Sequence, residues 1–421
     1  MTSQNKPNRL WTKDFTIIQL GSMISIFGNA LFRFASSLLV LDYTQSTLYY
    51  AIYIALFNLP MIFAPLISGA ILDRFSRKRT IYTLDFISAG IYALIAVVIS
   101  KGWFSFGILA IYTFVLGTIE GVYHVAYESF YPMLISEGNF TKAYAFSSFI
   151  ETIVAVVFPI STFLYNAIGI APLLAINALS FLIAAVMETR IEKEEDYVEL
   201  QRKKLESSGK KDSRLKILLT DMKEGFQYLY SEKGLFAVAC YFGFSALFGG
   251  AQQVALLPYF KDTYANGEYV YTMIMGAGII ARAVGGAFHY NFKLPVKRKY
   301  AIALAVYLSI DVITGTYLFA PIPIMIIMCS IEGLLGITSY TIRVSATQSY
   351  VPHEKKGRFN GAFNMLSTVG SLIGEISAGA LALIIPIRMV MLMFGAVTFI
   401  AAAVFIGGNR KHIAPIYNRQ E

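Results

Sequence analysis

The feature that most limits how this chain can fold is its recurring long apolar segments, each about as long as a bilayer is thick. A membrane-spanning helix needs about 20 predominantly apolar residues, and twelve segments meet that requirement. They lie near residues 15–41, 48–72, 80–100, 104–127, 143–166, 171–189, 235–260, 268–290, 300–319, 322–346, 359–384 and 387–407. Only 14% of the residues are charged, well below the fraction usual in soluble domains. The sequence therefore predicts an all-α polytopic membrane protein.

A charged stretch divides these segments into two sets of six. We expect an N-terminal six-helix bundle over residues 1–189, a cytoplasmic linker over 190–233 and a C-terminal six-helix bundle over 234–421. Within the linker, RLKILLTDMKEGFQYLY places apolar residues at helical spacing against charges, which predicts an amphipathic helix along the membrane surface. The tripeptide Ile-Glu-Gly occurs in the fourth segment of each set, at Glu120 and again at Glu332, as expected for two repeats.

The distribution of charge predicts the orientation of the chain. The stretch GAILDRFSRKR, from Gly69 to Arg79, joins two apolar segments and holds one acid and four basic residues. Such a turn cannot lie in hydrocarbon, and its excess of Arg and Lys places it in the cytoplasm. Because most of the 35 Lys and Arg fall in segments of the same sidedness, the net charge of +9 requires no nucleic-acid partner. We expect a multi-pass protein of the cell membrane with both termini cytoplasmic.

The same stretch resembles a motif of the major facilitator superfamily, between its second and third helices. Gly69, Asp73, Arg74, Arg77 and Lys78 match that motif, whereas Ser76 stands where the family usually has glycine. DMKEGFQYLYSEKGLF and INALSFLIAA are similar to the branch of macrolide-efflux-type proteins and enterobactin exporters. The resemblance implies two six-helix bundles and transport by alternating access. We expect a small-molecule substrate and a monomeric protein.

Ionisable residues inside apolar segments are costly, so each needs a structural or functional reason. Glu120, His124 and Glu128 recur at intervals of four residues and share one face of the fourth helix. Glu120 and His124 could exchange a proton, as a proton-coupled carrier requires, or they could simply join two packed helices by a hydrogen bond.

Further charged residues are expected near the middle of the membrane. Arg33 shares a face of the first helix with Asn29, and its expected partner is a carboxylate of Glu120, Glu151 or Glu332. Candidates for proton coupling or for the substrate cavity are Arg33, Glu120, His124, Glu151, Glu332 and Glu375. The resemblance implies that Asp85 and Asp311 lie on outward-facing helices, where we expect them to make contacts between helices.

The resemblance also implies a conformational latch on the cytoplasmic side. We expect Asp73 to face the start of the eleventh helix, and Arg74 and Arg77 to pair with Glu128. Gly69 would allow close approach of helices. The latch residues are therefore Gly69, Asp73, Arg74, Arg77 and Glu128.

The leading hypothesis is a secondary transporter that exports amphipathic, drug-like or macrolide-like molecules in exchange for protons. The family's helix-four arginine is replaced by Gly117 and only Pro159 of the antiporter motif remains, so coupling must use other groups. A siderophore or lipid exporter of the same fold is the alternative, and a membrane receptor or membrane enzyme is a third. No phosphate-binding loop, catalytic motif, metal site or cofactor motif is present, so we expect neither an enzyme nor a cofactor.

Overall fold

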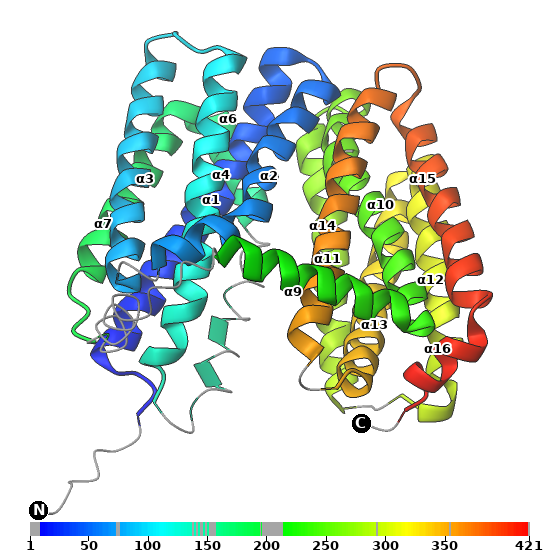
Figure 1. Ribbon diagram of the computed structural model, residues 1–421. Coiled ribbons are helices and arrows are strands. Elements are labelled where there is room, and N and C mark those ends of the chain that lie inside the picture. The colour runs from blue at the N-terminus through cyan, green and yellow to red at the C-terminus, as the bar shows by residue number, and fades with distance from the viewer. Residues whose placement is uncertain are drawn as a thin grey trace, which may run out of the picture. The chain divides into compact units, whose positions relative to one another are not determined.

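The computed structural model describes most of the chain. The described residues are 9–72, 76–136, 139, 142–143, 146–147, 150, 157–193, 195, 214–291, 294–352 and 355–419. Glu151, Asp73 and Arg74 of the predicted sites lie outside these ranges. Every regular element of the described part is a helix, as the sequence predicts (Figure 1).

The described helices overlap the predicted apolar segments, most of them over nearly their full length. Those of the first set are α1 (Lys13–Thr44), α2 (Thr47–Leu72), α3 (Arg77–Ser100), α4 (Phe106–Leu134), α6 (Val157–Ile168) and α7 (Ile170–Glu188). Those of the second set are α10 (Lys233–Thr263), α11 (Gly267–Asn291), α12 (Lys299–Thr316), α13 (Ile322–Tyr350), α14 (Lys356–Leu381) and α15 (Ile387–Ala401). The fifth segment is described as a continuous helix only from Val157, so its full length remains a prediction.

Nine helices of the described part are long and apolar enough to cross a membrane. The helix α14 falls outside this group although it has 26 residues, because small and polar residues such as Gly370 and Ser371 dilute its apolar character. Such residues suit a helix that packs closely against another helix, where side chains must be small.

The chain divides into two compact units. Unit 1 comprises Met1–Thr44 and Leu56–Arg214, and unit 2 comprises Gln45–Ala55 and Leu215–Glu421. In unit 1, α3 packs against α4 and α7, and α1 packs against α4, α6 and α7. The hydroxyls of Ser76 and Ser105 cap the starts of α3 and α4 by accepting backbone N–H groups. Gly169 separates α6 from α7 with φ of 76°, a left-handed conformation that glycine adopts without strain.

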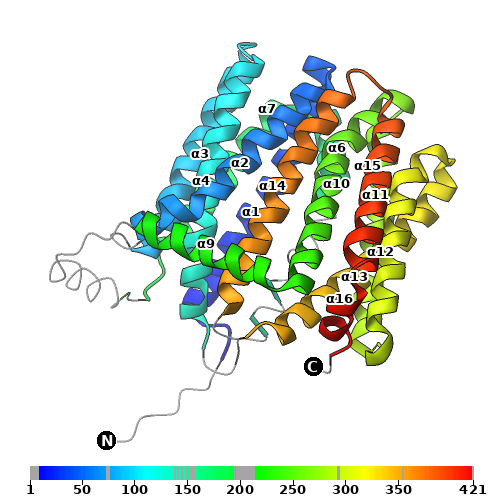
Figure 2. The same cartoon turned by 45° about the vertical axis from the view of Figure 1, so that its right-hand side comes forward.

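In unit 2, α10 packs against α14, α11 against α13, and α12 against α15 (Figure 2). Glycines bring α10 and α14 into backbone contact. A Cβ atom on Gly250 would lie 2.1 Å from the Ser371 carbonyl oxygen, and one on Gly374 would lie 1.9 Å from the Leu247 carbonyl oxygen. Only glycine therefore fits at these positions.

The helix α9 (Arg214–Ser231) occupies the stretch of the linker for which an amphipathic helix is predicted, and its position along the membrane surface stays a prediction. It is held to unit 2 by polar contacts with the segment around the start of α14. Arg358 forms an ion pair with Glu224 at 2.6 Å, and Lys355 lies over the ring of Tyr228 at 4.6 Å. The remaining elements are η1 (Val296–Arg298), η2 (Tyr317–Phe319), the π-helical η4 (Ala402–Gly407) and α16 (Arg410–Tyr417).

Candidate functional site

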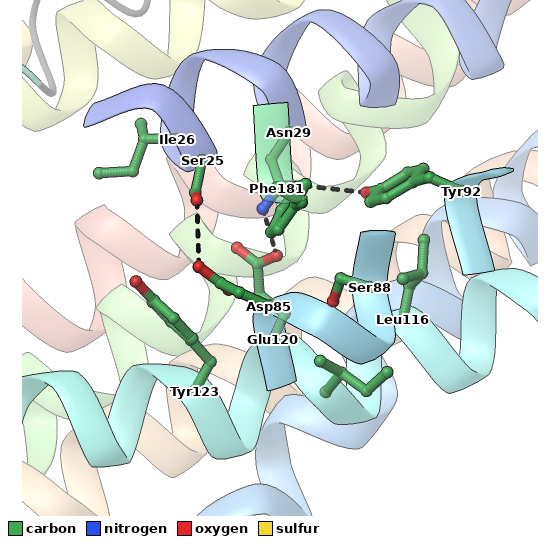
Figure 3. Close-up of a pocket in the computed structure, with 11 residues that line it drawn as sticks. Ser25, Ile26, Asn29, Asp85, Ser88, Tyr92, Leu116, Glu120, Tyr123 and Phe181 are labelled. Carbon is green, nitrogen blue, oxygen red and sulfur yellow. Dashed lines mark hydrogen bonds between the residues drawn. The ribbon is translucent and has the colours of Figure 1, made fainter. Parts of the chain in front are cut away.

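A small polar cavity lies within unit 1 between α1, α3, α4 and α7. Its volume is about 50 Å³, enough for a few water molecules, since one needs roughly 10–15 Å³ by this measure. Figure 3 shows side chains from these helices converging on it. The polar lining residues are Ser25, Asn29, Asp85, Ser88, Tyr92, Glu120 and Tyr123. A carboxylate-lined cavity inside an apolar bundle is the strongest candidate for a functional site in the described part of the chain.

Asn29 lies at the centre of a hydrogen-bonded group in this cavity. Its side-chain amide donates to the Glu120 carboxylate at 2.8 Å, and its carbonyl oxygen accepts from the Tyr92 hydroxyl at 2.9 Å (Figure 3). These bonds join α1, α3 and α4. Tyr92 therefore fixes the amide so that its N–H₂ group faces Glu120, an arrangement suited to an ionised carboxylate.

Arg33 and His124 act electrostatically on Glu120. The Arg33 guanidinium also lies over the Phe57 ring at 4.3 Å. Of the carboxylates predicted as partners of Arg33, Glu120 is close enough in unit 1 to interact electrostatically with the guanidinium. Glu151 lies outside the described residues. His124 is exposed, one turn along α4 from Glu120.

From this cavity, a ladder of polar side chains extends towards the end of unit 1 where α1 begins and α7 ends, which we call the Lys13 end. On α4, the rings of Tyr123, Tyr127 and Tyr131 stack in sequence, with centroids 6.1 and 5.2 Å apart. The Tyr127 hydroxyl donates to Ser22 at 3.3 Å, and the Tyr131 hydroxyl donates to Gln19 at 2.9 Å.

Sequence reasoning did not assign this ladder, although a signal was present. Gln19, Ser22, Ser25 and Asn29 recur at intervals of three or four residues, which places them on one face of α1. The three tyrosines of the ladder recur at intervals of four on α4. Two polar stripes on apolar helices indicate that the helices face each other through polar contacts.

In unit 2, Glu332 of α13 lies close to Arg282 of α11. A Cβ atom on Gly336 would lie 3.4 Å from an Arg282 guanidinium nitrogen and 3.5 Å from a Glu332 carboxylate oxygen. Arg282 acts electrostatically on Glu332, as Arg33 does on Glu120. Glu375 of α14 is buried and accepts a hydrogen bond from Ser371 at 3.2 Å. Each unit therefore contains an acid and an arginine on different helices.

The start of α3 is bound by a residue that sequence reasoning missed. The Glu195 carboxylate accepts the backbone N–H groups of Arg77 at 2.9 Å and Lys78 at 2.8 Å, and the Ser76 hydroxyl at 3.2 Å. A carboxylate is favoured there by the helix dipole. Glu195 follows the predicted sixth helix closely, and no sequence pattern links it to α3.

The described latch residues lie on α2, α3 and α4. Gly69 lies in α2, and Glu128 is exposed on α4. The Arg77 side chain donates to the carbonyl of Ser129, the residue after Glu128, at 2.8 Å. A latching role for these residues remains a prediction.

The chemistry available at this site is proton binding. No cluster of three or more His, Cys, Asp or Glu residues that could hold a metal ion occurs among the described residues. The titratable carboxyl of this group is that of Glu120, and the positively charged Arg33 acts electrostatically on it.

Comparison with known proteins places the chain in a family. Residues 18–375 match the family model described as Major Facilitator Superfamily. The chain is 24% identical over 370 residues to Macrolide efflux protein A of Streptococcus pyogenes, covering 86% of this chain and 87% of that protein. It is 24% identical over 383 residues to Multidrug efflux pump Tap of Mycolicibacterium fortuitum, covering 87% and 88%. The crystal structure of the POT family transporter PepTSo has the same fold, with a TM-score of 0.67 and 14% identity over 96% of this chain and 98% of that one.

Proposed function

This chain belongs to the Major Facilitator Superfamily, and from that premise we propose that it exports amphipathic small molecules by alternating access, driven by protons. Family and relatives indicate a membrane transporter rather than an enzyme. The finer parts of the proposal are the direction of transport, the coupling ion and the substrate class. Each rests on separate observations.

The hydrogen bond between Asn29 and Glu120 carries the proposal of proton coupling. An ionised Glu120 accepts the Asn29 amide and attracts Arg33, so that α1 and α4 are held together at this level. When Glu120 binds a proton, it loses its charge and its attraction for the guanidinium. Protonation thus changes the interaction between two helices, which is how a proton gradient could bias a conformational equilibrium.

The substrate class is proposed from the names of two relatives. One relative is named for macrolide efflux and another for multidrug efflux, and each aligns with more than four fifths of this chain. Macrolides are bulky and amphipathic, and aromatic side chains, which make up 14% of this chain, can hold such molecules by shape and stacking.

The orientation is proposed from the charge of the loops. Both termini and the Gly69–Arg79 loop would be cytoplasmic, because basic residues concentrate there. The Lys13 end of unit 1 would then face the cytoplasm. The loop would act as a latch that opens and closes during the cycle, and the protein would work as a monomer.

A vesicle assay tests direction, coupling and substrate class together. Inverted and right-side-out membrane vesicles with and without the protein would be screened with fluorescent dyes, macrolides and siderophores under an imposed proton gradient. We expect dyes and macrolides to accumulate in inverted vesicles with an acidic interior, and a protonophore to abolish the accumulation. Accumulation only in right-side-out vesicles would overturn export, and accumulation of siderophores alone would overturn the substrate class.

A further inference from the structure

Two carboxyl groups are buried against each other inside unit 1, outside the group formed by Asn29, Tyr92 and Glu120. They belong to Asp85 of α3 and Glu188, the last residue of α7, which are 1% and 0% exposed. No donor group bonds to either Glu188 oxygen among the described residues, and the group that interacts with this carboxyl as a side-chain hydrogen-bonding neighbour is the Asp85 carboxyl. Asp85 accepts the Ser25 hydroxyl at 3.5 Å.

The neighbouring backbone encloses Glu188 tightly. A Cβ atom on Gly21 of α1 would lie 2.8 Å from a Glu188 carboxylate oxygen. The glycine therefore makes room for the carboxyl in a place where a larger residue would displace it. The carboxyl has been accommodated inside the bundle and is not directed to the surface.

No positive charge compensates the pair within the part of the chain that the structure describes. The titratable groups that face it come from α4, and they are Glu120, Tyr123 and Tyr127. The packed helix α1 contributes the neutral Ser25, and Tyr165 of α6 instead donates to Asp42 at 2.7 Å. Two adjacent carboxylates cannot both stay ionised in such surroundings, because each raises the cost of charging the other.

We propose that Asp85 and Glu188 hold one shared proton, and that this pair is a second proton-binding site from which Glu120 is loaded. The shared proton is inferred from the burial of the two carboxyl groups and from the charges around them. The loading of Glu120 rests on the proposed proton coupling and on the cavity of about 50 Å³, which both Asp85 and Glu120 line.

The transfer is a simple proton relay. The O–H bond of the protonated carboxyl breaks and an O–H bond to a cavity water forms, while that water gives one of its own protons to the Glu120 carboxylate. One negative charge moves from Glu120 to the pair, and no oxidant, reductant or further reactant is needed. The buried Tyr123 hydroxyl, which has no hydrogen-bonding partner among the described residues, lines the same cavity and can order the water.

The test is a pH titration of carboxyl absorption by infrared difference spectroscopy on the full-length protein in lipid nanodiscs. We expect a protonated-carboxyl C=O band in the wild type whose titration midpoint moves down by about one pH unit or more in Asp85→Asn and in Glu188→Gln. The double variant should lose the band. Asp311→Asn is the matched control, because Asp311 is 2% exposed on α12 but faces Tyr241 and Thr398 and, within the described ranges, no second acid. It should leave the pair's midpoint unchanged.

Contrary outcomes are equally definite. A midpoint that neither single variant moves would overturn the shared proton. The titration is repeated with an organic cation replacing Na⁺ and K⁺, and a band that appears only after this replacement would overturn the proposal in favour of a bound alkali cation. If the single variants do not fold, Gly21→Ala, which pushes on Glu188, must shift the midpoint for the proposal to stand.

The loading of Glu120 is tested separately in proteoliposomes. In the double variant we expect gradient-driven transport to slow about tenfold while substrate counterflow, which needs no net proton movement, is retained. Equal losses of both rates, or no loss, would overturn the relay. Absence of gradient dependence in the wild type would instead contradict the proposed function, and the infrared titration would still decide whether the pair shares a proton.

Discussion

The side-chain amide of Asn29 donates a 2.8 Å hydrogen bond to the carboxylate of Glu120, across 91 positions of sequence. Both residues lie within membrane-spanning helices, α1 and α4. A carboxylate placed there needs a donor, because an unsatisfied charge in a low-dielectric environment is expensive. The bond thus makes an ionised Glu120 tolerable and gives its protonation a structural consequence.

Tyr92 orients this amide, so its hydroxyl is the first prediction. Tyr92→Phe removes the 2.9 Å hydrogen bond to the Asn29 carbonyl oxygen and frees the amide to turn. We expect a loss of stability of about 1 kcal/mol and slower gradient-driven transport. The measurement pairs thermal unfolding in detergent with transport in proteoliposomes. Tyr230→Phe, on a ring in α9 that is 74% exposed, is the control and should change neither quantity. An unaltered transport rate in Tyr92→Phe would show that the orientation of Asn29 is irrelevant.

Adjacent glycines on α10 provide a matched test of helix packing in unit 2. Gly250→Ala places a methyl group 2.1 Å from the Ser371 carbonyl oxygen and should cost about 1–3 kcal/mol through forced separation of α10 and α14. Gly249→Ala meets nothing within 4 Å and should be neutral or stabilising by up to about 1 kcal/mol. Thermal unfolding of the two variants should differ clearly. Equal stabilities would contradict the observed contact.

Glu195 should stabilise the start of α3. Glu195→Ala removes the acceptor for two backbone N–H groups and should cost about 1 kcal/mol, as loss of a helix cap does. Hydrogen exchange should accelerate in the first turn of α3. Protection that stays at the wild-type level in this turn would refute the capping role.

The control for Glu195 is Glu192→Gln, which removes an exposed ion pair with Lys13. The hydrogen bond from Lys13 lowers the pKa of Glu192. The stabilisation from this pair is therefore present at neutral pH and lost as the pH falls through the lowered pKa. Because both side chains are exposed, solvent screens the pair, and we expect no resolvable change in unfolding temperature at neutral pH.

The sequence predicted the helices well because each membrane-spanning helix is encoded locally, by a run of apolar residues. The same local logic found Glu120, since an acid in an apolar run is conspicuous. Asn29 was placed on one face with Arg33, but its bond to Glu120 depends on the register between two helices far apart in sequence. Sequence periodicity within α1 or α4 contains no such information.

Other contacts were missed for related reasons. Glu188 ends its apolar segment, where an acid is expected at the membrane interface, yet its side chain is 0% exposed and lies beside Gly21 of α1. Glu195 stands at the start of a charged linker, where many acids are solvated, and only the fold brings it to α3. Asp85 was expected to make contacts between helices, and its bond with Ser25 of α1 confirms this.

The central claim is that Glu120 binds the proton that drives transport, and Glu120→Gln in proteoliposomes tests it most directly. Gradient-driven efflux of a substrate found in the vesicle screen would be measured beside substrate binding and counterflow, with Glu192→Gln as a surface control. We predict that Glu120→Gln abolishes gradient-driven efflux while binding and counterflow remain measurable, because glutamine keeps the shape of the neutral acid but cannot exchange a proton. Efflux by Glu120→Gln at the wild-type rate would contradict the claim.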